Sequence, residues 1–119
     1  MGGHTLARHV GKTDAELAAR LRRESEISSA STYTDRRTAE RSVTAALVSG
    51  DGKFAAWQRR NGRRPNLVLN YVARGTPLGR SLSRGQPASV SCYRAIVVLR
   101  WDERLNRFYV LTSYPEAEP

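Results

Sequence analysis

The sequence predicts an α+β fold, with N-terminal helices packed on one face of an antiparallel sheet. Three observations favour this class. Apolar residues recur at helical spacing up to about residue 62, and they alternate with polar residues from about residue 66 to residue 115. A short polar segment between the last two apolar runs is typical of a hairpin. Because 119 residues suit one core, we expect a single domain over residues 1–119, helical over about 4–62 and stranded over about 66–115.

The first clear helix is predicted over residues 13–24, and it begins with a capping box. Thr13 can accept a hydrogen bond from the Glu16 amide, while the Glu16 carboxylate reaches back to the Thr13 amide. Leu17 and Leu21 then fall on one apolar face, which can pack on a sheet.

Two further helices are predicted over residues 35–50 and 51–62. The first has apolar residues at helical spacing, and in the second Phe54 and Trp57 share a face. Residues 28–35, which are mostly serine and threonine, are predicted to be a polar linker before them.

Strands are predicted in the remainder of the chain. The first covers residues 66–73, and a short one lies near residues 80–82. The strongest strand patterns cover residues 89–101 and 107–114, with residues 102–106 as the hairpin between them.

The last strand carries an unusual pair of hydroxyl groups. Regular alternation predicts Val110, Thr112 and Tyr114 on one face, and Leu111 and Ser113 on the other. A strand buried on both faces would carry apolar residues at these positions. Two hydroxyls on one face therefore indicate a polar site.

The charge balance favours a polyanionic partner. There are 20 basic and 11 acidic residues, for a net charge of +9, and 18 of the basic residues are arginine because Lys12 and Lys53 are the only lysines. The planar fork of donors on arginine matches phosphate oxygens and stacks on bases. A nucleic acid is the partner that this composition predicts.

The sequence disfavours a metal site, an intrachain disulfide and insertion into a membrane. Two histidines and Cys92 form no zinc-binding motif, and Asp51, Asp102 and Glu103, which could hold Mg²⁺, are scattered over turns and helix ends. A lone cysteine excludes an intrachain disulfide. No apolar run approaches the ~20 residues that cross a bilayer, and no predicted helix is apolar enough to insert. We expect no metal, no cofactor and no stable membrane insertion.

Metal-free RNA cleavage needs only side chains that this chain has. The attack of a 2′-hydroxyl on its own phosphate requires a general base, a general acid and cations beside the phosphate. Histidine is the natural proton carrier near neutral pH, and both histidines, His4 and His9, lie in the first ten residues. An alternative stays open, which is a non-catalytic RNA- or DNA-binding module that uses arginines for the backbone and Tyr or Trp for stacking. The arginines in question are Arg59, Arg60, Arg63 and Arg64.

Four stretches together resemble a known family. They are GGHTLARHVGKTDAELAARL, ASTYTDRRTAERSV, the tryptophan of FAAW, and VVLRWDERLNRFYVLTSYPE. The resemblance is to the bacterial RNase A-like toxin domain, found at the C-termini of contact-dependent growth inhibition proteins (CdiA-CT) and other polymorphic toxins. It runs from Gly3 to Glu116.

The resemblance implies an RNase A-like fold without disulfides and an endoribonuclease that needs no metal. It also implies that the chain is the C-terminal part of a larger secreted or surface-delivered toxin, which acts in the cytoplasm of a competing bacterium. The partners it implies are RNA and a cognate immunity protein. Because the chain is basic, we expect that immunity protein to be acidic.

The positions that match the family's catalytic residues are His9, Arg20, Thr112 and Tyr114. We expect His9 to be the general base, or the acid in the reverse proton step, and Arg20 to bind the scissile phosphate. Thr112 is expected to hydrogen-bond a phosphate oxygen or the base, and Tyr114 to donate a proton or a hydrogen bond. The last strand has no histidine, so the general acid stays open. Two further residues, His4 and Lys12, are secondary or substrate-binding candidates. His4 has no assigned role, and Lys12 is expected to line the groove after a helical segment that ends at Gly11.

Overall fold

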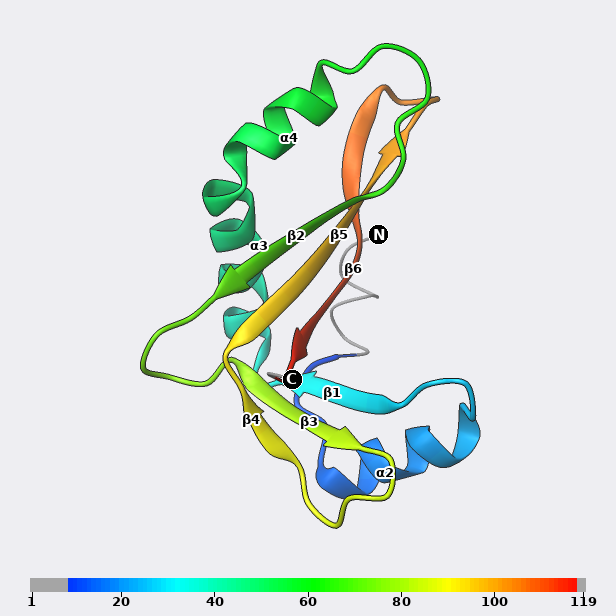
Figure 1. The fold of residues 1–119 in the computed structure, drawn as a ribbon, viewed down its shortest axis with the longest axis vertical. Coiled ribbons are helices and arrows are strands. Elements are labelled where there is room, and N and C mark those ends of the chain that lie inside the picture. Colours follow the sequence, from blue (N-terminus) through cyan, green and yellow to red (C-terminus); the bar gives the residue numbers. More distant parts are fainter. Residues whose placement is uncertain (1–8, 118–119) are drawn as a thin grey trace.

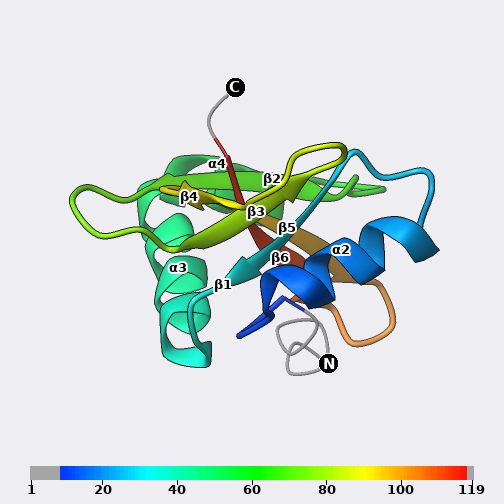
Figure 2. The same ribbon diagram turned by 90° about the horizontal axis from the view of Figure 1, so that it is seen from below.

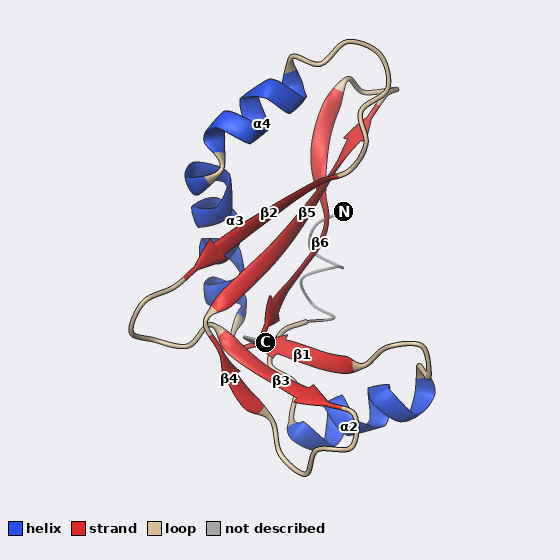
Figure 3. Ribbon diagram, in the orientation of Figure 1, coloured by secondary structure: helices blue, strands red, loops and turns tan. Residues whose placement is uncertain are grey.

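The structure is a computed structural model that describes residues 9–117, so His4 lies outside the described residues. The described part has three helices and six strands (Figure 1, Figure 3). The helices are α2 (Asp14–Arg23), α3 (Arg36–Ser49) and α4 (Asp51–Gln58). The strands are β1 (Ser29–Tyr33), β2 (Leu67–Val72), β3 (Gly79–Ser83), β4 (Val90–Cys92), β5 (Arg94–Asp102) and β6 (Arg107–Glu116). The predicted α+β class is confirmed.

The strands form two antiparallel sheets rather than the single sheet expected. One has the order β1-β3-β4 and the other has the order β2-β5-β6. The strand predicted over residues 89–101 divides at Tyr93, because Val90–Cys92 pairs with β3 while Arg94–Asp102 pairs with β2 and β6. The chain therefore passes directly from one sheet to the other at this point, where Cys92 is buried as a free thiol.

The linker predicted over residues 28–35 is wrong, because these residues contain β1. Every residue of β1 after Ser29 is buried. Ser31 and Thr32 are polar yet buried, and the Thr32 hydroxyl accepts from the Lys12 amide at 2.9 Å and donates to the Tyr33 carbonyl at 3.1 Å. Such hydrogen bonds allow polar residues to be buried. The strand therefore lacks the alternation of apolar and polar residues by which a strand is predicted from sequence.

Helix α2 packs on the first sheet, α3 and α4 pack on the second, and Ala39 of α3 also contacts Tyr33 of β1. Leu17 and Leu21 of α2 pack on Ala30 and Leu82 of the first sheet, and Figure 2 shows α2 beneath β1. On the second sheet, α3 and α4 form a larger core with β2 and β5. Its buried members are Ala46, Trp57, Leu69, Val97 and Leu99. No helix within residues 9–117 is long and apolar enough to cross a membrane.

A bulge in β6 corrects the predicted alternation of the last strand. Val98 pairs with Thr112, but its neighbour Leu99 pairs with Val110, so Leu111 is the extra residue. Val110 therefore faces the helices and packs in their core, whereas Thr112 points to the opposite face. The expectation that these two residues share a face is wrong.

One buried hydrogen bond joins the two sheets. The hydroxyl groups of Tyr33 on β1 and Ser113 on β6 are 2.6 Å apart, and both residues are fully buried. Burial raises the pKa of Tyr33 to about 12, so its phenol stays protonated and can donate at neutral pH.

The tight packing of Gly79 against β1 gives the first prediction. A Cβ atom at Gly79 would collide with the Thr32 carbonyl oxygen, whereas one at Gly52 in α4 would meet nothing within 4 Å. We expect Gly79→Ala to lower the free energy of unfolding by about 1–3 kcal/mol or more, as overpacking does. Gly52→Ala, the control, should raise it by up to about 1 kcal/mol. Urea denaturation measures both, and equal stability of the two variants would contradict the close approach.

The second prediction concerns the hydrogen bond between the sheets. Tyr33→Phe should lower the free energy of unfolding by about 1–3 kcal/mol, because it leaves the Ser113 hydroxyl buried without this partner. The double variant Tyr33→Phe/Ser113→Ala should be less destabilised than the sum of the single variants, with a coupling of about 0.5–3 kcal/mol. Additive losses in thermal or urea unfolding would show that the two hydroxyls do not interact.

Candidate active site

A cavity of about 420 Å³ lies between the β1-β3 surface and the end of β6. All four residues matched to the family, His9, Arg20, Thr112 and Tyr114, line it. They come from the segment before α2, from α2 itself and from β6, which are far apart in the sequence. The cavity therefore brings together an imidazole, a guanidinium, an alcohol and a phenol.

His9 is positioned by backbone pairing with the end of β1. Its carbonyl accepts from the Tyr33 amide at 2.6 Å, and the Gly11 amide donates to the Tyr33 carbonyl at 2.9 Å. Gly11 has a φ of +63°, which favours glycine and lets the chain turn from this pairing toward α2. The His9 side chain is buried, and its ring centroid lies 6.0 Å from that of Tyr114.

Arg20 is presented by α2. The predicted capping box is present, since Thr13 and Glu16 each donate a backbone N–H to the other's side chain. Leu17 and Leu21 are buried on the sheet, which leaves Arg20 at the edge of the helix. Its Nε donates to Glu24 at 3.0 Å, and within residues 9–117 both Nη groups keep their donors for another acceptor.

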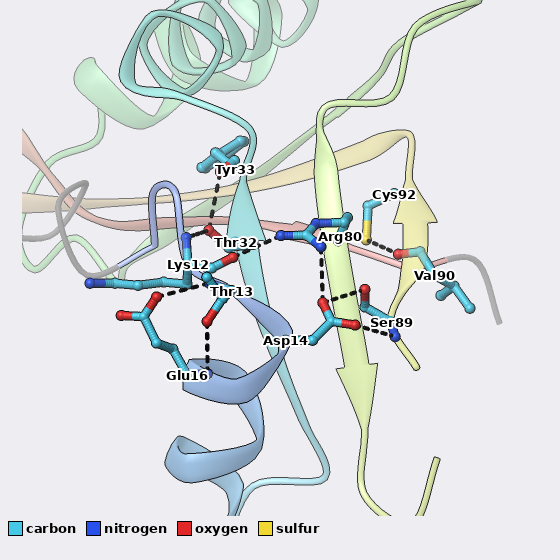
Figure 4. A network of polar contacts seen from close by, with 10 residues as sticks. All are labelled: Lys12, Thr13, Asp14, Glu16, Thr32, Tyr33, Arg80, Ser89, Val90 and Cys92. Carbon is cyan, nitrogen blue, oxygen red and sulfur yellow. Dashed lines mark hydrogen bonds and ion pairs between the residues drawn. The ribbon is translucent and has the colours of Figure 1, made fainter. Parts of the chain in front are cut away.

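A polar network fixes the start of α2, as Figure 4 shows. The Asp14 carboxylate accepts from the Ser89 hydroxyl at 2.7 Å and from Arg80 Nη1 at 2.9 Å, while Arg80 Nη2 donates to the Lys12 carbonyl at 2.8 Å. The hydrogen bonds from Ser89 and the charge of Arg80 hold the pKa of Asp14 below its ordinary value. These contacts tie α2, and with it Arg20, to β3 and to the segment before β4.

Lys12 does not line the main cavity. It lines a neighbouring cavity of about 250 Å³, which shares Arg20 and Ser31 with the first. Lys12 thus lies beside the candidate site without entering it.

Thr112 and Tyr114 share the cavity-facing side of β6. Burial raises the pKa of the Tyr114 phenol, and the nearby Glu116 carboxylate raises it further. Tyr114 is therefore protonated at neutral pH and can donate a hydrogen bond or a proton. On the neighbouring strand, Arg94 Nη2 donates to Glu116 Oε1 at 2.6 Å.

The structure adds residues that sequence reasoning missed. Most are hydroxyl groups from the segment expected to be a linker, together with one from β3, and two are carboxylates. They are Ser28, Ser29, Ser31, Ser81, Glu26 and Glu116. The density of serine in residues 28–31 was the available signal.

The arginines of the alternative RNA-binding interpretation are partly engaged in packing. Arg64 donates to the carbonyls of Trp57 and Gln58, and its guanidinium lies 4.0 Å from the ring centroid of Trp101. Trp57 is buried and donates its indole N–H to the Pro65 carbonyl at 2.7 Å. Arg64 and Trp57 therefore stabilise the end of α4.

No group of three or more His, Cys, Asp or Glu residues within 9–117 is placed to hold a metal ion.

Comparisons with known proteins agree on one family. A family model described as the bacterial CdiA-CT RNase A domain matches residues 3–115. The chain is similar to the crystal structure of a CdiA-CT/CdiI complex from Y. kristensenii 33638, with 33% identity and a TM-score of 0.83, over 96% of this chain and 99% of that one. No match was found among curated proteins. The match extends over nearly the whole chain, which therefore belongs to the bacterial CdiA-CT RNase A domains.

Proposed function

We propose that this domain is a metal-independent endoribonuclease that cleaves RNA by attack of the 2′-hydroxyl on the adjacent phosphate. The observation that carries the proposal is the single cavity lined by His9, Arg20, Thr112 and Tyr114. Membership of an RNase A domain family supports ribonuclease activity. The products would be a 2′,3′-cyclic phosphate and a free 5′-hydroxyl.

His9 is the proposed general base. It takes the proton from O2′ as the bond from O2′ to phosphorus forms, which is work suited to an imidazole near neutral pH. Its backbone pairs with the end of β1 and its side chain is buried, which limits the freedom of the imidazole before substrate binds.

Arg20 and Thr112 would stabilise the charge that develops on the phosphate. The two Nη groups of Arg20 offer donors to non-bridging oxygens, and the ion pair with Glu24 holds the guanidinium in place. The Thr112 hydroxyl can donate one more hydrogen bond from the opposite wall.

Tyr114 is the proposed general acid. The bond from phosphorus to O5′ breaks as the phenol gives its proton to O5′. The raised pKa of Tyr114 keeps this proton in place until a strongly basic alkoxide develops. For the same reason the phenol is a poor base.

We also propose that an immunity protein neutralises the domain. The similar structure from Y. kristensenii is a CdiA-CT/CdiI complex, which supports a CdiI-type partner. A net charge of +9 favours an acidic one. In this proposal the domain is the C-terminal part of a larger CdiA toxin and cuts RNA in the target-cell cytoplasm.

The third prediction tests the reaction class. RNA is incubated with wild-type protein in excess chelator, and fragments ending in 2′,3′-cyclic phosphate are expected. His9→Ala should lower kcat by ~10²–10⁴-fold, because it removes the proton acceptor. Arg37→Ala, a change at an exposed position on α3, serves as the control purified in parallel. Full activity of His9→Ala, or loss of wild-type activity in chelator, would contradict the proposal.

The fourth prediction tests the role of Tyr114. Tyr114→Phe should lower kcat on RNA by ~10²-fold or more, because O5′ then leaves without a proton. On a nucleoside 3′-(4-nitrophenyl phosphate), whose leaving group needs no proton, the loss should be much smaller. Equal losses on both substrates would show that Tyr114 orients the phosphate and is not the acid.

A further inference from the structure

One face of the β2-β5-β6 sheet is turned away from α3 and α4. Leu99 and Trp101 of β5, with Phe108 and Val110 of β6, pack in the core beneath α3 and α4. Because side chains alternate along a strand, the residues between them point to the opposite face. The hairpin that ends this face lies at the end of the molecule remote from α2 (Figure 1).

Because of the bulge, the residues that continue this face beyond Thr112 differ from those that regular alternation predicts. The pairs in order are Val98 with Thr112, Arg100 with Tyr109, and Asp102 with Arg107. Paired residues share a face, and residues two apart on β5 share one as well. Tyr109, and not Val110, is therefore in line with Thr112. A strand rises ~3.3 Å per residue. The pair of Arg100 and Tyr109 therefore lies about 7 Å along β5 from the pair of Val98 and Thr112, and the pair of Asp102 and Arg107 lies about 13 Å from it.

The chemistry of this row matches a single-stranded nucleic acid. Arg100 and Arg107 are exposed, and neither forms an ion pair or a side-chain hydrogen bond within residues 9–117. Asp102, opposite Arg107, is already used by the turn, since its Oδ1 accepts from the amides of Arg104 and Leu105. Tyr109 is half-buried beside Arg100, which pairs an aromatic surface with a cation.

We propose that Arg100, Tyr109 and Arg107 form an extension of the substrate site that holds the RNA chain beyond the scissile phosphate. Tyr109 would stack a base, and the two arginines would contact backbone phosphates, as in proteins that bind single strands. The substrate class is thus a single-stranded segment several nucleotides long. This inference rests on the proposed ribonuclease function.

The test compares kcat/KM on a dinucleotide and on a single strand of about 12 nucleotides, a length within the range that single-strand grooves hold. The ratio of kcat/KM for the longer RNA to that for the dinucleotide should fall at least about fivefold in Tyr109→Ala, the lower end of a stacking contribution. It should fall in Arg100→Ala and Arg107→Ala as well.

Two controls separate the proposal from a general loss of charge or structure. Tyr109→Phe keeps the ring and should keep the ratio. Arg37→Ala removes an exposed arginine from α3, which packs on the opposite face of the sheet, and should leave the ratio unchanged. An unchanged ratio in Arg100→Ala and Tyr109→Ala, or an equal fall in Arg37→Ala, would overturn the proposal.

A binding measurement distinguishes failure of this inference from failure of the proposed function. A 2′-O-methylated RNA of about 12 nucleotides cannot be cleaved by transesterification, so its Kd is measurable whether or not the protein is a ribonuclease. The Kd should rise at least about fivefold in Tyr109→Ala. The slope of log K against log salt should weaken by about 0.7 for each arginine removed. Unchanged Kd and slope would overturn the proposal even if the protein cleaves RNA.

Discussion

The candidate site depends on how the two sheets are held together, and the hydrogen bond between Tyr33 and Ser113 lies at that junction. These residues are 80 positions apart, and their hydroxyls are 2.6 Å apart in the interior. Ser113 lies between Thr112 and Tyr114 on β6, and the Tyr33 backbone pairs with His9 and Gly11. One buried contact therefore fixes the strand that carries the two hydroxyls relative to the segment that carries the histidine.

The rest of the site is arranged around this junction. The Asp14 network fastens the first turn of α2 to β3 and to the residue before β4, so that Arg20 reaches the cavity from the other side. Both walls are held by hydrogen bonds between segments distant in sequence and by apolar packing. A domain whose one cysteine is buried and free has no covalent means of holding them.

The features that sequence reasoning predicted are those specified locally. The capping box at Thr13, the hairpin after β5 and the helices over residues 36–58 each depend on neighbours within a few positions. Strand β1 depends on tertiary partners, because it pairs with β3 and the hydroxyl of its buried Thr32 is hydrogen-bonded to the Lys12 amide and the Tyr33 carbonyl. The chemistry of RNA cleavage predicted which residue types the site would contain. Their positions in the sequence were predicted only by the family resemblance. The serine residues that line the cavity were found only from the structure.

The bulge at Leu111 also has a consequence for how the last strand can vary in length. Val110 pairs with Leu99 and Thr112 pairs with Val98, so the register of the ladder shifts by one residue at Leu111. Loss of that residue would leave a regular ladder with the same side chains on the same faces, whereas a one-residue deletion between 112 and 116 would exchange the faces of residues beyond it. Relatives with a last strand one residue shorter at this point can therefore keep both the core and the candidate site intact.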